Sequence, residues 1–203
     1  NNHHFTVLAG QEGVANRSDS FYAYANGGIT DDRLTNLQNG TQSKYTMSES
    51  YSASNFLSFF GHVDYTIMDK YIIDGTIRND ACSRFGKNNK NATFWSAGAL
   101  WKMKNEGFLN DVDWVNELNF KASYGTQGNA SIGDYQHLAL LGSYTSEYAG
   151  GPATYIGQPS NNGLTWEQQA LLTIGVNGRL ASMVDFNIEF YNRKTSSMLM
   201  HIP

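Results

Sequence analysis

Cysteine, proline and charged side chains are scarce in this chain of 203 residues. Its single cysteine, Cys82, can form neither an internal disulfide nor a metal site built from several cysteines. Charged residues make up 16% of the chain, below the roughly 25% of an average soluble domain. The formal net charge of -4 provides no basic surface of the kind that nucleic-acid-binding domains use, so we expect no nucleic-acid partner.

Long apolar runs are missing as well. No stretch approaches the roughly 18 apolar residues that a transmembrane helix needs, which excludes such a helix. Membrane-spanning strands are shorter and alternate apolar with polar residues, so a membrane β-barrel is not excluded. The chain is instead rich in Asn, Ser, Thr and Gly, and 13% of its residues are aromatic, a composition that favours a β protein with wet surfaces.

Apolar and polar residues alternate along much of the chain. In the segment 71–78, Ile73 and Ile77 fall on one face of a strand, and Asp74 and Arg78 fall on the other. Similar alternation predicts about seven strands, at roughly 4–11, 57–67, 71–78, 95–104, 117–124, 166–177 and 184–191. Most span about 9–13 residues, whereas soluble strands average about 5–6 and membrane-spanning strands need about 9–11.

The predicted links between these strands alternate in length. The short links are 68–70, 105–116 and 178–182, and the long links are 12–51, 79–93 and 125–163. Long links without secondary structure are uncommon in compact soluble domains. In an up-and-down sheet, strict alternation places all long links at one end, as in outer-membrane barrels with short periplasmic turns and long extracellular loops. The link lengths therefore favour an antiparallel up-and-down meander of the membrane kind.

Aromatic residues near the strand ends are open to two interpretations. The residues concerned are Tyr65, Tyr71, Trp95, Trp101, Tyr124 and Trp166. Aromatic girdles at the two interfaces of a membrane would produce this arrangement. Alternatively, these residues form the core of a soluble β-sandwich or barrel that acts as a carbohydrate-binding module. Strand lengths and link lengths favour the membrane interpretation.

Catalytic and metal-binding patterns are not found in the sequence. Asp31 and Asp32 are paired carboxylates, but their Gly- and Asn-rich surroundings indicate a solvated turn rather than a buried acid and base. The five histidines show no metal-ligand spacing such as H-E-x-x-H. Neither a G-x-S-x-G elbow nor a phosphate-binding glycine loop is present. We therefore expect no enzyme activity, no metal and no cofactor.

Several sequence blocks occur in a recognisable order, over a region that runs from about residue 52 to the end of the chain. They are DKY at 69–71, IRNDACSRFG at 77–86, FWSAGALW at 94–101, NEGFL at 105–109, LNFKASYGTQGNASIGDY at 118–135, NGLTWEQ at 162–168 and EFYNRKTSSML at 189–199. Through these blocks the chain resembles the SusC-like branch of the TonB-dependent outer-membrane receptors. In that family the second block reads R-x-D-G-S-S-R-F-G, so Ala81 and Cys82 replace the usual Gly and Ser, and Trp95 stands where Pro is common.

The resemblance implies an all-β fold, an antiparallel up-and-down meander that forms part of a large transmembrane β-barrel of about twenty-two strands. Receptors of this family lie in the outer membrane of Gram-negative bacteria and import oligosaccharides or peptides with energy supplied through TonB. A SusD-like surface lipoprotein usually caps the barrel. Because such receptors are several times longer, we expect residues 1–203 to be a single segment of about seven strands, without the plug domain and the remaining strands.

Within such a barrel, each face of the strands has an expected neighbour. Outer-membrane lipid would cover the face that carries Ile73, Ile77, Trp95, Ala97 and Trp101. The lumen would meet the opposite face, which carries Asp74, Thr76, Arg78 and Lys102. Four charged residues, Asp74, Arg78, Asp80 and Arg84, form a set at one strand–loop junction, where we expect them to brace the barrel rather than bind ligand.

Tyrosines in two predicted loops are candidate ligand contacts. Tyr144, Tyr148 and Tyr155 lie among small residues in the link 125–163, and Tyr22 and Tyr24 lie in the stretch FYAYAN at 21–26. Tyrosine rings can stack on sugar rings, and their hydroxyls can hydrogen-bond to them. The alternatives are packing of one loop on another and docking of the partner lipoprotein.

Overall fold

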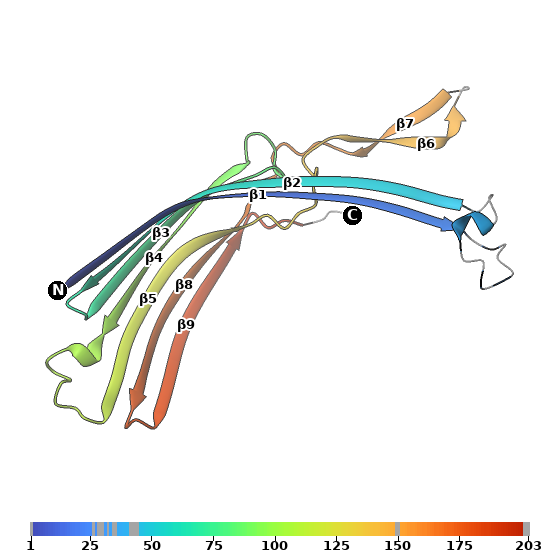
Figure 1. Cartoon of the computed structure of the whole chain (residues 1–203). Helices are drawn as coiled ribbons and strands as arrows, with labels where there is room; N and C mark the ends of the chain where they lie inside the picture. Colours follow the sequence, from blue (N-terminus) through green and yellow to red (C-terminus); the bar gives the residue numbers. More distant parts are fainter. Residues whose placement is uncertain are drawn as a thin grey trace. The chain divides into compact units, whose positions relative to one another are not determined.

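Nine β-strands and two short 3-10 helices make up the computed structural model, which describes residues 2–25, 27, 31, 33, 36–40, 45–148 and 151–200 (Figure 1). The strands are β1 (His3–Ala25), β2 (Tyr45–Ile67), β3 (Tyr71–Cys82), β4 (Asn91–Lys102), β5 (Val115–Asn129), β6 (Leu140–Tyr148), β7 (Gly151–Gln158), β8 (Glu167–Leu180) and β9 (Val184–Ser196). The helices are η1 (Leu37–Asn39) and η3 (Met103–Asn105). None of the helices in the described residues is long and apolar enough to cross a membrane.

Seven of the strands form one sheet in the order β1-β2-β3-β4-β5-β8-β9, and β6 and β7 form a separate hairpin inserted between β5 and β8. Strands that follow one another in the chain therefore lie beside one another in the sheet, and each pair from β2 to β9 is antiparallel. The predicted all-β antiparallel meander is confirmed. By its contacts the chain divides into two compact units, one of residues 1–14 with 56–203 and one of residues 15–55.

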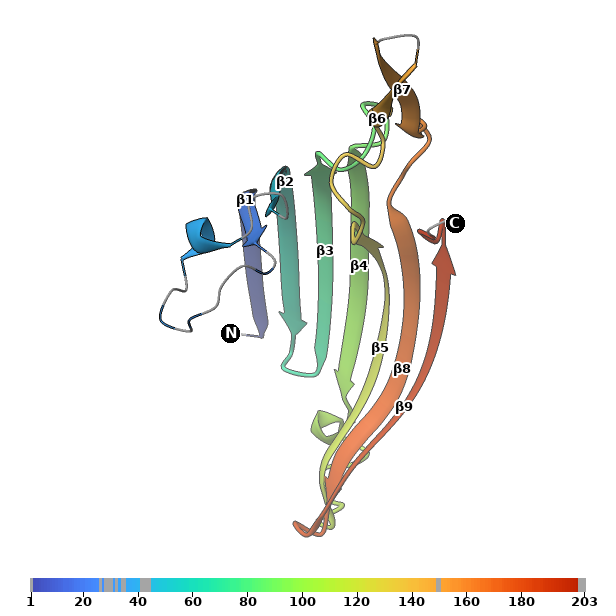
Figure 2. The ribbon, with the colours of Figure 1, turned by 90° about the vertical axis from the view of Figure 1, so that its right-hand side faces the viewer.

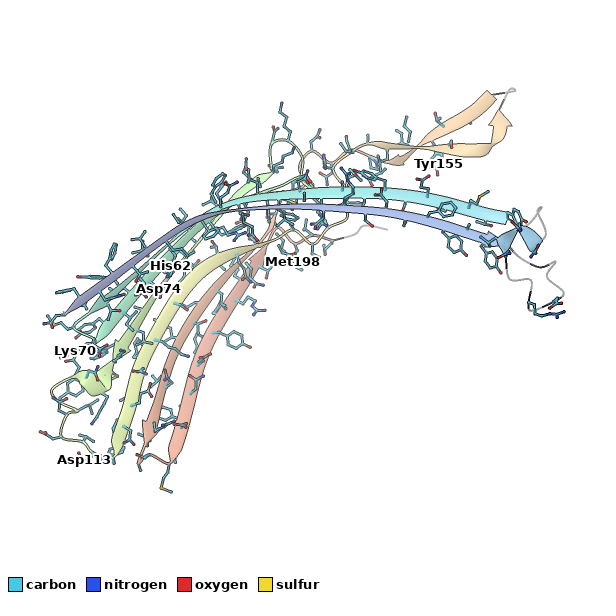
Figure 3. All side chains as sticks on the ribbon, in the orientation of Figure 1. His62, Lys70, Asp74, Asp113, Tyr155 and Met198 are labelled. Carbon is cyan, nitrogen blue, oxygen red and sulfur yellow. The ribbon has the colours of Figure 1, made fainter. Side chains whose placement is uncertain are left out.

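Short connections lie together at one end of the larger unit, as Figure 2 shows for β2–β3, β4–β5 and β8–β9. Lys70 and Asp113 lie at this end, and Met198 lies at the opposite end (Figure 3). Two of the short connections use the same backbone geometry. Met68 and Asp69 have φ of 52° and 54°, and Ala181 and Ser182 have φ of 50° and 55°. Two consecutive residues with positive φ are the pattern of the hairpin turn whose twist matches that of the flanking strands.

Two of the predicted long links are wrong because they contain strands. Residues 12–25 and 45–51 continue β1 and β2, and both faces of these extensions are largely exposed. A strand with polar residues on both faces has no apolar alternation, so periodicity could not identify it. The strands β1 and β2 are hydrogen-bonded neighbours in the sheet, and the hydroxyl oxygens of Ser20 and Ser50 lie 2.6 Å apart between the extensions. The link 125–163 likewise contains the end of β5 and the hairpin of β6 and β7.

The third predicted long link, 79–93, is shorter than expected. Strand β3 continues to Cys82, and β4 begins at Asn91, so only residues 83–90 connect them. The residues 79–82 lack the apolar alternation of the rest of β3, yet 79–81 pair with 91–93 in the ladder, and the Cys82 N–H donates to the carbonyl of Lys90. Backbone pairing extends these strand ends beyond the region of apolar alternation.

The apolar face of the sheet, which carries Ile73, Ile77 and Trp95, is not an interior of this chain. The register places Ile77 directly opposite Trp95, so the two side chains share a face. Ile73, Ile77 and Trp95 are 49%, 58% and 47% exposed. A soluble sandwich would bury these residues under a second sheet, so this alternative is not favoured. The expected single face of Ile73, Ile77, Trp95, Ala97 and Trp101 is confirmed by the register of β3 and β4.

Aromatic pairs mark two levels of the apolar face. At the short-link end, Tyr71 stacks on Trp101 with 6.3 Å between ring centroids. Farther along β4, Trp95 lies 5.6 Å from Tyr124. Six residues separate Trp95 from Trp101, which is about 20 Å along a strand. This spacing is close to the roughly 25 Å height of the apolar band of outer-membrane barrels.

Trp166 does not belong to this face, contrary to the sequence-based prediction. It is only 4% exposed, and its ring packs against Phe85 and Phe94. The reason is that β8 begins at Glu167, so Trp166 precedes the ladder and the alternation of the strand does not apply to it.

Candidate functional site

Arg78 lies on the polar face of the sheet, the face that also carries Asp74 and Asp80. Its Nε donates to Asp80 Oδ1 at 2.5 Å, and its Nη2 donates to Glu12 Oε2 at 2.7 Å. The guanidinium also lies 5.6 Å from the centroid of the Phe60 ring, its neighbour across the β2–β3 ladder. Three strands, β1, β2 and β3, are therefore joined through one arginine side chain.

Arg84 makes a second set of contacts just beyond the end of β3. Its Nε donates to Asp134 Oδ1 at 2.8 Å, and its Nη1 donates to the carbonyl of Ala130 at 3.2 Å. The guanidinium lies 5.7 Å from the centroid of Phe56. Arg84 thereby ties the β3–β4 link to the segment that follows β5.

The main apolar cluster of the described residues is formed by Cys82, Phe85, Phe94 and Trp166, and the Phe56 ring that contacts Arg84 packs against it. Phe85 is fully buried, and its ring centroid lies 4.9 Å from that of Trp166. The Trp166 Nε1 donates to the carbonyl of Lys90 at 3.0 Å. The β3–β4 link is thus not an extended loop, because its phenylalanine folds back and packs beside the polar face.

A hollow of about 460 Å³ lies next to these residues, within the larger unit. We call it the ionic cavity. Its principal lining residues are Glu12, Phe56, Arg78, Asp80, Arg84 and Trp166. The volume lies in the range of about 300–1,000 Å³ that is typical of ligand sites.

Asp74 does not join the charged residues with which the sequence grouped it. It precedes Arg78 by four residues, which is about 13 Å along a strand. Its side chain lies across Gly98, where an added Cβ would stand 2.4 Å from Asp74 Oδ1. The structure therefore brings together Arg78 with Asp80 and Arg84 with Asp134, and it leaves Asp74 in another part of the polar face.

The sequence did not identify Glu12 and Asp134 as the partners of the two arginines. Glu12 fell in a predicted loop, although it belongs to β1 and lies on the same side of the sheet as Arg78. Asp134 is 50 residues from Arg84 in sequence, and no local pattern links the two. Charge complementarity to the two arginines was the available signal, but many carboxylates would have satisfied it equally well.

Tyr22 and Tyr24 lie within β1 rather than in a loop, which corrects the prediction for the stretch FYAYAN. They are two positions apart on one face of the strand, and their rings stack with centroids 6.5 Å apart and planes at 10°. Both rings remain about half exposed, at 57% and 48%. The two half-exposed rings are compatible with contact to a flat ligand. They would bring no polar group to that contact beyond their own hydroxyls.

The other three tyrosines belong to the separate hairpin. Tyr155 lies in β7 directly opposite Gly142, and its ring covers that glycine, where an added Cβ would stand 2.5 Å from Tyr155 Cζ. Its position is shown in Figure 3. Tyr144 and Tyr148 lie in β6, and their side chains fall outside the described part of the chain.

An unforeseen cluster around Glu106 lies at the short-link end of the sheet. Its carboxylate accepts hydrogen bonds from Tyr71 Oη at 2.7 Å, Lys70 Nζ at 2.9 Å and Trp101 Nε1 at 3.1 Å. These bonds, that of Tyr71 first, lower the pKa of Glu106 from its ordinary value of 4.5 to about 2. Glu106 therefore connects the turn between β2 and β3 to the link that follows β4.

Metal binding has no candidate in the described residues, where no group of three or more His, Cys, Asp or Glu side chains could hold an ion. Asp31 pairs with Arg33 at 2.6 Å on an exposed stretch, and Asp32 and His201 lie outside the described residues.

No family model matches the chain. Curated relatives do match. TonB-dependent receptor P26 of Formosa agariphila is 32% identical over 99% of this chain and 21% of its own length. TonB-dependent receptor SusC of Bacteroides thetaiotaomicron is 33% identical over 73% of this chain and 16% of its own length. The chain thus spans about a fifth of the length of these relatives.

A solved structure shows the same architecture. The RagAB peptide transporter aligns with a TM-score of 0.90 and 31% identity, over 100% of this chain and 22% of the transporter chain. Its closed and open states align similarly, with TM-scores of 0.88 and 0.87. TonB-dependent receptors are outer-membrane β-barrel proteins of Gram-negative bacteria. By sequence over nearly its whole length and by fold, this chain belongs to the SusC-like TonB-dependent receptors.

Proposed function

We propose that residues 1–203 are one barrel-wall segment of an outer-membrane receptor that imports an oligosaccharide or a peptide. The observation that carries the proposal is the two-faced sheet. One face exposes Ile73, Ile77 and Trp95, and the other carries ion pairs and a cavity. In a membrane barrel the first face meets lipid and the second meets the lumen.

We infer the parts of the receptor outside residues 1–203 by analogy with the longer relatives. The plug domain and the remaining strands would lie in other parts of the full-length protein, and the remaining strands would pair with the edges of β1 and β9. An unpaired strand edge is not stable in a bilayer because its backbone groups have no hydrogen-bond partner. Energy would come through TonB, and a SusD-like lipoprotein would cap the barrel. The protein would bind, gate and pass its ligand without enzyme chemistry and without a cofactor.

The experiment uses the full-length receptor in its own Gram-negative host. Its location is determined by separating inner and outer membranes, and uptake is measured with labelled oligosaccharide and peptide mixtures, with and without TonB. The proposal expects an outer-membrane protein whose deletion abolishes uptake of one of the two classes, and the loss of TonB should have the same effect. A full-length product that is soluble without detergent, or uptake that is unchanged in both strains, would overturn it.

A further inference from the structure

We infer that the ionic cavity binds a short peptide through a cationic group of that peptide. This inference rests on the proposed function and selects one of its two ligand classes. Three features of the cavity support it: carboxylate oxygens without a hydrogen-bond partner among the described residues, the charged groups around it, and aromatic rings that are already covered.

The carboxylates of the cavity keep free oxygens. Glu12 uses Oε2 and Asp80 uses Oδ1 in their bonds to Arg78. Within the described part of the chain, Glu12 Oε1 and Asp80 Oδ2 have no hydrogen-bond partner. Both acids line the cavity, and the Glu12 side chain is half exposed. Two carboxylate oxygens are therefore available as acceptors beside the Arg78 guanidinium, which is already paired twice.

The balance of charge around the cavity favours a cation. Glu12 and Asp80 line the cavity as carboxylates, and Arg78 and Arg84 line it as guanidinium groups. Arg84 is paired with Asp134, which lies outside the lining, so the two lining carboxylates face one further guanidinium, that of Arg78. A partly buried excess of negative charge is stabilised by an added cation. A metal ion is not favoured, because the described residues contain no set of ligands for one. An ammonium or guanidinium group of a peptide fits the remaining acceptors.

The aromatic rings of the cavity are not open for stacking. The Arg84 guanidinium lies over Phe56 at 5.7 Å. Trp166 is 4% exposed, and Phe85 and Phe94 pack against its ring. Recognition of a neutral sugar commonly relies on an open aromatic face, which this cavity does not provide. Asn129 and Ser131 also line the cavity, and their polar side chains suit the amide groups of a peptide backbone.

The test uses the purified full-length receptor in detergent and isothermal titration calorimetry. The probes are the tripeptides Ala-Lys-Ala and Ala-Glu-Ala with blocked termini, and a set of neutral oligosaccharides. Ala-Lys-Ala should bind at least about tenfold more tightly than Ala-Glu-Ala. Glu12→Gln and Asp80→Asn should each weaken its binding about tenfold. Glu189→Gln, which alters a carboxylate paired with Lys121 elsewhere on the polar face, is the control and should leave binding unchanged.

A variant that preserves the ion pairs guards against loss of folding. Val14 lines the cavity and is 39% exposed, so Val14→Trp should fill the cavity and abolish binding of Ala-Lys-Ala. Equal affinity for the two tripeptides, or unchanged binding in Glu12→Gln and Val14→Trp, would overturn the inference. Binding of oligosaccharides alone would overturn it as well, while leaving the proposed function intact. Failure of the proposed function would instead appear as a receptor outside the outer membrane.

Discussion

Arg84 Nε lies 2.8 Å from Asp134 Oδ1, and this ion pair joins the β3–β4 link to the segment after β5. The two side chains are 25% and 15% exposed, so solvent screens the pair less than it would screen one on an open surface. The same link contributes the buried ring of Phe85 to the apolar cluster. That Arg84 braces the barrel stays a prediction, and this contact is the one through which we expect it to act.

Asp134→Ala should lower the free energy of unfolding by about 1–3 kcal/mol, because it leaves a partly buried guanidinium without its carboxylate. The measurement is urea unfolding of the full-length receptor in detergent. The matched control is Asp185→Ala, which removes the partner of Arg179 in a pair that is 54% and 68% exposed. That change should cost clearly less stability than Asp134→Ala, because solvent screens an exposed pair. Equal losses in the two variants would contradict this account.

Gly128→Ala should destabilise the receptor by about 1–3 kcal/mol through overpacking. The Phe94 ring lies directly over Gly128, so that an added Cβ would stand 2.1 Å from Phe94 Cζ. The ring cannot withdraw freely, because it packs against Trp166. The control is Gly13→Ala in β1, where an added Cβ meets nothing within 4 Å.

Thermal unfolding of both glycine variants gives the comparison. A second change, Phe94→Leu, should restore part of the stability of Gly128→Ala, because the smaller side chain makes room for the added methyl group. A Gly128→Ala protein as stable as Gly13→Ala would show that the ring does not occupy this position.

The contribution of Glu106 should depend on pH. Its pKa is lower in the folded protein, about 2, than its ordinary value of 4.5, so the bonds stabilise the fold fully above pH 4.5 and are lost as pH falls toward 2. Glu106→Gln should therefore be less stable than the wild type at neutral pH, and the difference should shrink below pH 4.5. The test is to measure the melting temperatures of the wild type and of Glu106→Gln from neutral pH down to pH 2.

Asp113→Asn is the control for this pH dependence, since Asp113 is an exposed carboxylate in the same link. Its stability should follow that of the wild type at every pH. A difference between wild type and Glu106→Gln that stays constant from neutral pH to pH 2 would rule out the carboxylate as the cause.

Ile73→Arg should impair folding into the membrane, because Ile73 lies on the apolar face between the two aromatic levels. An arginine facing the bilayer midplane costs about 2–4 kcal/mol. Ser123→Arg places the same side chain on the polar face and should be tolerated, since Ser123 lies opposite Gly98 there. The amount of heat-modifiable barrel in isolated outer membranes is the measurement. Equal yields of the two variants would argue against a lipid-facing Ile73.

Alternation in the sequence was sufficient for the central parts of the strands, because each has one apolar and one polar face. It failed where that contrast ends. The extensions of β1 and β2 are exposed on both faces, and Trp166 lies one residue before its strand begins. Periodicity reports a difference between two environments, and it contains no information where the environments are alike.

Site residues were predictable only in part. Arg78 and Arg84 were visible as charges at a strand–loop junction, but their partners Glu12 and Asp134 come from distant segments that only the register brings near. The hydrogen bonds to Glu106 bring the link after β4 against Lys70, Tyr71 and Trp101. No rule of sequence spacing predicts this contact.

The most direct test of the account is a nitroxide scan of residues 71–78 in the full-length receptor, reconstituted in lipid bilayers with Cys82 replaced by alanine. Each position is changed to cysteine and labelled, and its collisions with oxygen and with a water-soluble nickel complex are measured by electron paramagnetic resonance. The account predicts a period of two, with high oxygen accessibility at the odd positions, including Ile73 and Ile77, and high nickel accessibility at the even ones, including Asp74. Nickel accessibility at both parities, or protection from both relaxants at the odd positions, would contradict it.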